Sequence, residues 1–541
     1  MMVLWLPLVT TIVTIVSVHA NFTCPEIAKF CVCSEDTTWW VIESEYKQLR
    51  IVNCSSNFLE TIPDLSSLKN RPFHRLLLNN NNITVVNRSN FAGLSVKEIN
   101  LRKNPVKKIT GDAFHDLKDK IEILDMDSVR LTIDEGLSFL RGLRNLKVLD
   151  LGYNQVTKSK IKTFPPNIFS NFNLKSLRTL TLQALQMEKL DEGAFTGIEN
   201  LEQLDLSYNF LAEFPTELRR LTNLQDLKLY ANEIQILENN TFSGMTNLRQ
   251  LLIGVNEIDT IDNDAFNDLN NSIEEINLYH NPLYKVPTEA IRDLKNLKKL
   301  SLVKSHLSTI ENGTFLGEYK LKELHLDDNP TLSFEDEGMF SGMEDSLEVL
   351  FIRTLNLEKL PLNVLRRLDK LFYLDATDNV IKKIDKHFFN GLKLSHVKLM
   401  WNKIKHIDHR AFKNLDRGVI LNLRNNHLSD ISFILDVDKC TFDEIDVSEN
   451  SIPCDCNLEK VLNSGLVSWQ VIGYCYVENN SSGVTWYSFQ DDALMDYLWQ
   501  GCDRTKQHAF CMQSTSGASF FNNNSIMSVG LLVLYVVVVM L

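Results

Sequence analysis

The chain has 541 residues, a formal net charge of -13 and a sequence pI near 5.5. This acidic balance argues against nucleic acid as a partner. The length alone would imply several domains, but an internal repeat runs through most of the chain and instead predicts a solenoid, which grows without enlarging a single core.

Residues 1–20 are predicted to be a secretory signal peptide. Residues 3–18 are almost wholly apolar, and Val18 and Ala20 place small residues at the -3 and -1 positions of a cleavage site after Ala20. No Lys or Arg precedes the apolar run, so a membrane anchor is the alternative. The cysteines support secretion independently.

The ten cysteines cluster at the two ends of the repeat region, and none lies between Cys54 and Cys440. A solenoid has two raw ends that would expose its core, so it needs caps, and small secreted caps are held by disulfides. We therefore expect cysteine-rich caps at residues 21–72 and 453–502. Zinc is the alternative for the Cys-x-Cys pairs, and the oxidising context disfavours it. The cluster members are Cys24, Cys31, Cys33 and Cys54 at one end, and Cys454, Cys456, Cys475 and Cys502 at the other.

Residues 73–452 hold about sixteen repeats with a mean spacing of about 25 residues. One unit reads Leu201-x-x-Leu204-x-Leu206-x-x-Asn209-x-Leu211. The pattern resembles the leucine-rich repeat. It implies an α/β solenoid, a horseshoe with a parallel concave β-sheet, an irregular or short-helical convex side and disulfide-stapled caps.

Physical chemistry explains the repeat pattern. Leucines that alternate with period 2 point to one side of a short strand, and stacked units bury them in a continuous core. The asparagine amide would satisfy backbone groups in the buried turn. We expect local distortion where Val129, Leu185, Ser305 and Leu355 replace it. About ten residues later a second signal predicts a phenylalanine spine on the convex side: Phe114, Phe195, Phe242, Phe266, Phe315 and Phe412.

Residues beside the strand leucines are expected on the concave face. Aromatic side chains surrounded by charge are typical anchors of protein interfaces. We therefore hypothesise that repeats six to fourteen bind a partially basic protein, the alternative being scattered surface residues. The predicted ligand face consists of Tyr208, Tyr230, Tyr279, His280, His325, Phe351, Tyr373 and Trp401 with the acidic residues Asp226, Glu275 and Asp327.

The second cysteine cluster reads Pro453-Cys454-Asp455-Cys456-Asn457-Leu458, followed by Trp469, Cys475 and Cys502. Both clusters resemble the flanking modules of extracellular leucine-rich repeat proteins. That resemblance covers residues 24–502 and implies the pairs Cys24–Cys33, Cys31–Cys54, Cys454–Cys475 and Cys456–Cys502. Cys440 and Cys511 fall outside this pattern. They are left to pair with each other, or Cys511 to bridge two chains.

Sequons mark potential N-glycans on a secreted chain, and no concave strand centre carries one. Asn53 lies beside Cys54 in the presumed cap strand and is a doubtful site. Asn480 overlaps Asn479, so the two are not expected to be used together. The predicted acceptors are Asn21, Asn82, Asn87, Asn239, Asn270, Asn312 and Asn479.

The last segments predict a GPI anchor. Small residues at 514–519 precede a short polar stretch and an apolar run at 526–541, the order of a GPI signal. We expect residues 503–525 to form a linker with attachment at Ser516 or Gly517, and residues 526–541 to form the removed tail. The alternative is a short transmembrane helix, although no basic residue follows the run.

No catalytic motif, phosphate-binding loop or zinc spacing occurs in a credible context, so we expect no enzyme, metal or cofactor. The layout implies cell adhesion or ligand reception at the extracellular side of the plasma membrane. Its partner would be an extracellular or cell-surface protein, or a second copy of the chain. Innate immune recognition and a matrix or structural role remain alternatives.

Overall fold

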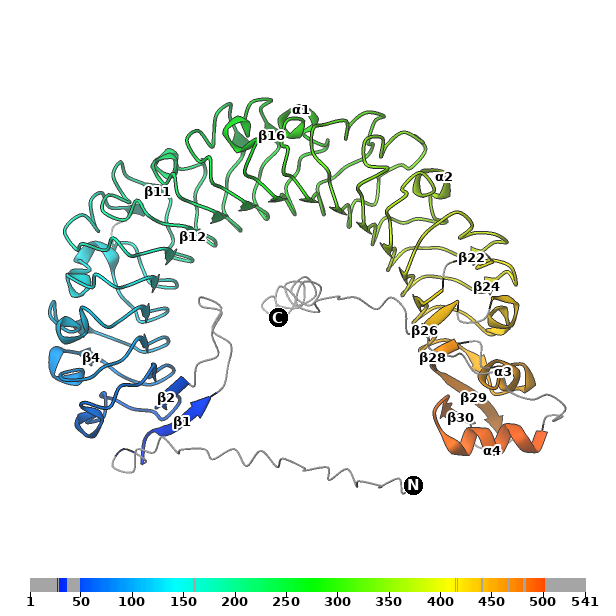
Figure 1. The fold of residues 1–541 in the computed structure, drawn as a ribbon, viewed down its shortest axis with the longest axis horizontal. Coiled ribbons are helices and arrows are strands. Elements are labelled where there is room, and N and C mark those ends of the chain that lie inside the picture. The colour runs from blue at the N-terminus through cyan, green and yellow to red at the C-terminus, as the bar shows by residue number, and fades with distance from the viewer. Residues whose placement is uncertain are drawn as a thin grey trace, which may run out of the picture. The chain divides into compact units, whose positions relative to one another are not determined.

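The computed structural model describes residues 27, 29–36, 49–158, 162–413, 415, 417–438, 441–464, 467–479 and 483–501. They divide into two compact units. The first runs to residue 355 and includes residues 363–371, and the second comprises residues 356–362 and those from 372 onward. Each unit is a stack of leucine-rich turns, so the expected α/β solenoid with a parallel sheet is confirmed (Figure 1).

The first unit is built on a sheet with one short strand per repeat. Within this unit the strands line the inner side of the curved ribbon (Figure 1). After the antiparallel pair β1–β2 all neighbours are parallel, and they pair with the central leucines in register, as in Leu204 with Leu227 and Leu227 with Leu251. The strands are β1 (Val32–Asp36), β2 (Leu49–Asn53), β3 (Arg75–Leu77), β5 (Glu98–Asn100), β7 (Ile123–Asp125), β8 (Val148–Asp150), β10 (Thr179–Thr181), β12 (Gln203–Asp205), β13 (Asp226–Lys228), β15 (Gln250–Leu252), β17 (Glu275–Asn277), β18 (Lys299–Ser301), β19 (Glu323–His325) and β20 (Val349–Phe351).

The second unit continues the pattern and ends in a small cap. Its parallel strands are β21 (Tyr373–Asp375), β23 (His396–Lys398), β25 (Val419–Asn422), β26 (Phe442–Asp446) and β28 (Val467–Ile472). The cap contains β27 (Ile452–Pro453), α3 (Cys456–Leu462), the antiparallel pair β29 (Tyr474–Asn479) and β30 (Gly483–Ser488), and α4 (Asp492–Gly501).

The opposite side of each repeat carries short pieces of structure rather than long helices. Paired two-residue strands occur there together with short 3-10 turns and α1 (Thr288–Ile291), while α2 (Leu362–Leu365) spans the boundary between the units. The strand pairs are β4 (Val85–Val86) with β6 (Lys108–Ile109), β9 (Thr163–Phe164) with β11 (Lys189–Leu190), β14 (Ile236–Leu237) with β16 (Thr260–Ile261), and β22 (Lys383–Ile384) with β24 (His406–Ile407).

The phenylalanine spine is present on this side. Phe242 is fully buried, and its ring centroid lies 4.8 Å from that of Phe214 and 5.6 Å from that of Phe266. In the second unit Phe389 and Phe412 stack at 4.8 Å. The spine also includes residues outside the predicted set, among them Phe214 and Phe389, which contact Phe242 and Phe412.

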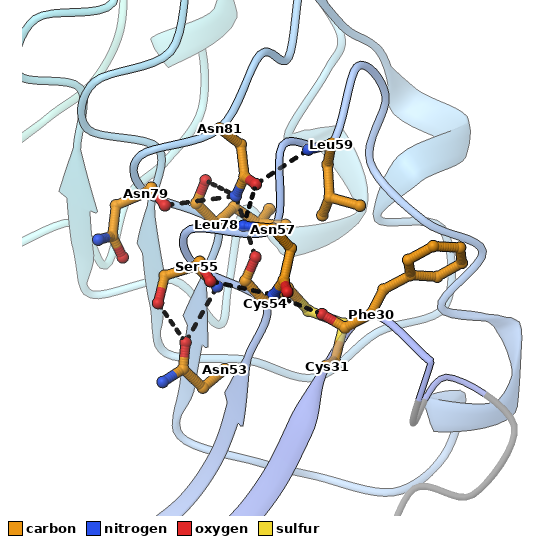
Figure 2. Close-up of a disulfide and its surroundings, with 10 residues drawn as sticks. All are labelled: Phe30, Cys31, Asn53, Cys54, Ser55, Asn57, Leu59, Leu78, Asn79 and Asn81. Carbon is orange, nitrogen blue, oxygen red and sulfur yellow. Dashed lines mark hydrogen bonds between the residues drawn. A yellow bond between two sulfur atoms is a disulfide. The ribbon is translucent and has the colours of Figure 1, made fainter.

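The asparagine of each repeat ties its own turn to the preceding repeat. Figure 2 shows the first case, at the N-terminal cap. The Asn81 Oδ1 atom accepts from the backbone N–H groups of Asn57 and Leu59, at 2.9 and 3.0 Å. Its Nδ2 donates to the carbonyls of Cys54 and Leu78, and Cys54 is itself disulfide-bonded to Cys31. Side-chain amides therefore satisfy the buried backbone groups between repeats.

The distortion expected where the asparagine is missing is confirmed. In regular repeats the residue before the slot has a left-handed backbone, as at Tyr208 with φ 58°. In the four repeats without asparagine, the residue after the slot is left-handed as well. These residues are Arg130, Gln186, His306 and Asn356, with φ of 63°, 62°, 56° and 57°. A second left-handed residue thus accompanies the loss of the amide.

Candidate functional site

The candidate site lies on the solvent-facing side of the first unit's sheet, opposite the side that packs on the leucine core. We define the sheet face by three positions in each repeat: the residues directly before and after the central leucine of the strand, and the residue two positions beyond the strand end. These positions alternate with the buried leucines. In β13 these are Asp226, Lys228 and Tyr230. In β17 they are Glu275, Asn277 and Tyr279. The predicted residues Asp226, Glu275, Tyr230 and Tyr279 therefore lie on one face.

Three predicted face residues are displaced from it. Tyr208, His280 and Trp401 occupy the left-handed position directly before the asparagine, with φ of 58°, 54° and 52°. They are one residue out of phase with the alternation and lie on the turn that follows the strand. Tyr208 and Trp401 are 47% and 54% exposed. Trp401 and Tyr373 belong to the second unit.

Three tyrosines form a ladder of ring contacts in the first unit. We call Tyr208, Tyr230 and Tyr279 the tyrosine ladder. Ring centroids are 5.8 Å apart for Tyr208 and Tyr230, and 6.4 Å apart for Tyr230 and Tyr279, whose planes differ by only 4°. Burial raises the pKa of all three phenols, so they are neutral hydrogen-bonding groups at physiological pH.

Gly254 makes the longer contact possible. Tyr230 and Tyr279 are on β13 and β17, with β15 between them. Gly254 occupies the matching position on the β15 repeat. A Cβ there would lie 2.9 Å from the Tyr279 carbonyl oxygen and 3.3 Å from the Tyr230 ring. The missing side chain lets the two rings lie across the intervening repeat.

The predicted residues Asp327, Phe351 and Tyr373 are not accessible anchors, which corrects the sequence-based hypothesis. They are only 4%, 9% and 7% exposed. The Asp327 carboxylate accepts from the backbone N–H and guanidinium of Arg353, at 2.7 and 3.2 Å. The Phe351 ring stacks 4.2 Å from His325, and the Arg353 guanidinium carbon lies 5.3 Å from the ring centroid. Neighbouring repeats have covered these side chains.

The second unit contains a similar arrangement around Tyr373. Its ring stacks on His396 at 5.9 Å, and the Lys398 ammonium lies 5.4 Å from the ring centroid. Burial, together with Lys398, lowers the pKa of His396. In both units a covered aromatic side chain on the sheet face is therefore accompanied by a cation from the chain itself.

Negative charge on the sheet face concentrates between β7 and β17. Among these strands Lys228 is a face cation, 4.0 Å from Asp205, and Arg102 of the neighbouring β5 repeat lies 3.2 Å from Asp127. The face acids are Asp125, Asp127, Asp150, Asp205, Asp226 and Glu275. Burial, and then the charges of Asp125 and Asp127, raise the pKa of Asp150 to about 7 against the hydrogen bond from the Gly152 N–H and the attraction of Arg102. The face between β7 and β17 thus carries more acidic than basic groups.

Several aromatic residues of this region escaped the sequence-based prediction. Tyr153, Phe210 and Tyr284 are 49%, 47% and 59% exposed, and Tyr284 stacks on His306 at 5.6 Å. They lie on the turns that follow the strands. The sequence signal that could have found them is an aromatic residue directly before the repeat asparagine or within three residues after it.

The predicted glycan acceptors of the first unit lie outside the strands of the main sheet. Asn82, Asn239 and Asn312 are exposed, and Asn87 and Asn270 are partly exposed. Asn479 is the last residue of β29, and Asn21 lies outside the described residues. Glycans at the first five positions would leave the sheet face uncovered.

Two of the disulfides implied by family resemblance, Cys31–Cys54 and Cys454–Cys475, are present. Cys33 and Cys456 are also disulfide-bonded. Their implied partners Cys24 and Cys502 lie outside the described residues, as do Cys440 and Cys511.

The described part of the chain contains no group of three or more His, Cys, Asp or Glu side chains suited to a metal ion. It also contains no helix with the length and apolar character needed to cross a bilayer. The predicted attachment residues Ser516 and Gly517 and the apolar run 526–541 lie outside it.

Comparisons with known families identify the repeats. The family model described as Leucine rich repeat matches residues 175–234, 222–283 and 271–331. The model described as BspA type Leucine rich repeat region (6 copies) matches residues 61–178. Together the two matches run without a gap from residue 61 to residue 331, through most of the first unit.

Curated relatives show the same relationship at low identity. The CD180 antigen of Mus musculus is 24% identical over 354 residues, covering 59% of this chain and 53% of the relative. Tsukushi-A of Xenopus laevis is 30% identical over 188 residues, covering 34% of this chain and 52% of the relative. The chain therefore spans about half the length of these relatives.

A solved structure of the TLR13–ssRNA13 complex is similar to the chain with a TM-score of 0.46 and 20% identity. The match covers 74% of this chain and 54% of that one.

Proposed function

Since this chain belongs to the extracellular leucine-rich repeat proteins, we propose that it is a GPI-anchored cell-surface protein that binds a protein ligand through its sheet face, in cell adhesion or ligand reception. It is not an enzyme. The observation that carries the proposal is the tyrosine ladder: the Tyr230 and Tyr279 rings lie on the solvent-facing side of the sheet, and Tyr208 contacts Tyr230 from the adjoining turn. Tyr208, at one end of the ladder, is 47% exposed.

The contrast with the spine phenylalanines supports this interpretation. Phe242 is fully buried, as expected for a residue that only builds the core. Tyrosine supplies a large apolar surface and a hydroxyl at low conformational cost, which is why interfaces are rich in it. The predicted glycan acceptors of the first unit are outside the main-sheet strands, so sugars there would not obstruct a ligand.

The proposed anchor rests on residue order in the linker. Small residues from Ser514 to Ser519 precede a polar stretch and the apolar segment 526–541. This is the order of a GPI attachment signal, with Ser516 or Gly517 as the modified residue. A lipid anchor would hold the ligand-binding face outside the cell, and the proposed partners are proteins rather than nucleic acids because the face is acidic.

The function is tested by mixing labelled cells that express the full chain with unlabelled cells that do not, before and after treatment with phosphatidylinositol-specific phospholipase C. Clusters of labelled cells alone would identify a second copy of the chain as the partner, and mixed clusters a partner on ordinary cells. Enzymatic release of the protein with loss of the clusters is the expected result. Protein that remains on the surface after treatment would contradict the lipid anchor, and absence of any cluster would contradict adhesion.

A further inference from the structure

One part of the sheet face has the composition of an ion-pair site that lacks its cation. From this we infer that Tyr230 and Tyr279, with Asp226 and Glu275, form a site for arginine side chains on the surface of a basic protein partner. The inference rests on the proposed function, since it names the chemistry of the ligand at the same face.

The chain itself contains the completed version of such a site. In the repeats of β19 and β20 the Phe351 ring, the Asp327 carboxylate and the Arg353 guanidinium are grouped together. The guanidinium lies over the ring and pairs with the acid. An arginine can do both at once, because it is planar, permanently charged and able to donate from several N–H groups.

The ladder supplies aromatic surface on this face without an arginine from the chain. Asp226 and Glu275 precede Tyr230 and Tyr279 by four residues, at the other end of each strand, so ring and carboxylate would take different arginines of one partner. The Tyr230 and Tyr279 rings are nearly parallel across Gly254, and both are partly exposed. Among the described residues, neither hydroxyl has a hydrogen-bond partner within the chain. Ring surface and two phenolic oxygens therefore remain available to a partner.

The acidic half is also uncompensated. The Asp226 carboxylate accepts from the Gln203 amide and the Glu275 carboxylate from the Gln250 amide, both at 2.8 Å. Within the described ranges, no lysine, arginine or histidine makes an ion pair with either. Each carboxylate is held in place by a neutral amide donor.

Other acids of the face show that this is a local property. Glu323 is paired with Lys299 at 3.3 Å and with His325 at 2.7 Å, and Asp327 is paired with Arg353. Strands β18–β20 thus neutralise their own charges. By contrast, Asp226 and Glu275 lie on β13 and β17, the same strands that lead to Tyr230 and Tyr279, so uncompensated acids and aromatic surface are carried by the same repeats.

The test uses fluorescent nona-arginine and nona-lysine peptides as probes on cells that display the full chain and lack sulfated glycosaminoglycans. Cells without the chain give the background, and a tag on the displayed chain reports its surface level. We expect nona-arginine to bind more tightly than nona-lysine. Replacing both rings, Tyr230→Leu with Tyr279→Leu, should weaken nona-arginine about tenfold and abolish the preference.

Matched variants separate ring, charge and folding. Tyr230→Phe with Tyr279→Phe keeps both rings and should retain the preference. Asp226→Asn with Glu275→Gln should weaken both probes, while Glu233→Gln with Glu257→Gln removes equal charge outside the sheet face and should change little. The inference is overturned if the two probes bind equally to the wild type, or if the leucine and phenylalanine pairs behave alike. If cells that display the wild-type chain prefer nona-arginine but form no clusters, the proposed role in cell adhesion is refuted and the arginine site stands.

Discussion

Left-handed residues in the repeats without asparagine show how one side chain controls local geometry. Asn209 satisfies backbone groups on both sides of its turn, since it accepts from Leu185 and Met187 and donates to Leu182 and Leu206. Leu185 occupies the same slot one repeat earlier and has no amide to offer. The chain there adopts a second left-handed residue at Gln186, with φ 62°. A left-handed backbone costs a residue with a side chain about 1–2 kcal/mol.

Replacing Gln186 by glycine should therefore be neutral or stabilising. The matched control is Glu233→Gly, at the same position of a repeat that has its asparagine and no left-handed residue there. Both side chains are exposed, so packing losses are small. We expect the free energies of unfolding of the two variants, measured by urea titration, to differ by about 1 kcal/mol in favour of Gln186→Gly. Equal destabilisation would show that the backbone at Gln186 stores no strain.

Asp150 should give the protein an unusual pH dependence. Its pKa is raised to about 7, whereas an aspartate in the unfolded chain titrates near 4. Between these values the folded state holds a proton that the unfolded state releases, so the contribution of this group to stability falls as pH rises from about 4 to 7. Asp150→Asn keeps an acceptor for the Gly152 N–H and removes the titration.

The measurement is thermal unfolding at pH 5 and pH 8. The wild type should lose about 1–2 kcal/mol more than Asp150→Asn between these two conditions. Asp259→Asn, at an exposed position, is the control and should follow the wild type. If Asp150→Asn shows the full wild-type change, the carboxyl is not titrating in that range.

At the scale of elements, nearest-neighbour packing holds the solenoid together. Each repeat buries its leucines against the next, and the phenylalanine spine does the same on the opposite side. Because Phe242 contacts both Phe214 and Phe266, its removal would damage two interfaces between repeats.

Phe242→Ala should cost about 3–5 kcal/mol in the free energy of unfolding, the usual range for a fully buried phenylalanine. Phe210→Ala removes the same ring from a position that is 47% exposed, and should cost well under 1 kcal/mol. Urea unfolding followed by circular dichroism measures both. A similar loss in the two variants would indicate that the spine is not part of the stabilising core.

Sequence periodicity predicts the strands and turns far better than it predicts the side-chain contacts between neighbouring repeats. The strands, the asparagine turns and the spine follow from spacing within one repeat. The burial of Asp327 and Phe351 depends on Arg353 and His325, which reach them from adjacent repeats. The stacking of Tyr230 on Tyr279 depends on Gly254, in a third repeat between them. Such contacts require the register between repeats and the direction in which each side chain leans, and neither is encoded in a single unit.

Across the molecule as a whole, separate faces have separate tasks. The leucines and phenylalanines make the solenoid, and disulfides hold Cys31 to Cys54 and Cys454 to Cys475 near its two ends. The linker would attach it to the membrane. The sheet face of the first unit remains for recognition, with an acidic and aromatic surface between β7 and β17. We propose that ligands bind on this face.

A glycan placed on the sheet face tests whether ligands bind there. Gln203→Asn with Asp205→Thr creates a sequon on β12, where Gln203 is exposed. Gln225→Thr creates one at the exposed Asn223, on the turn before β13, and serves as the control. With both variants at equal surface levels and shown to be glycosylated, we predict that the β12 glycan abolishes cell clustering and that the control glycan preserves it. Clustering that survives the β12 glycan would place the ligand elsewhere on the molecule.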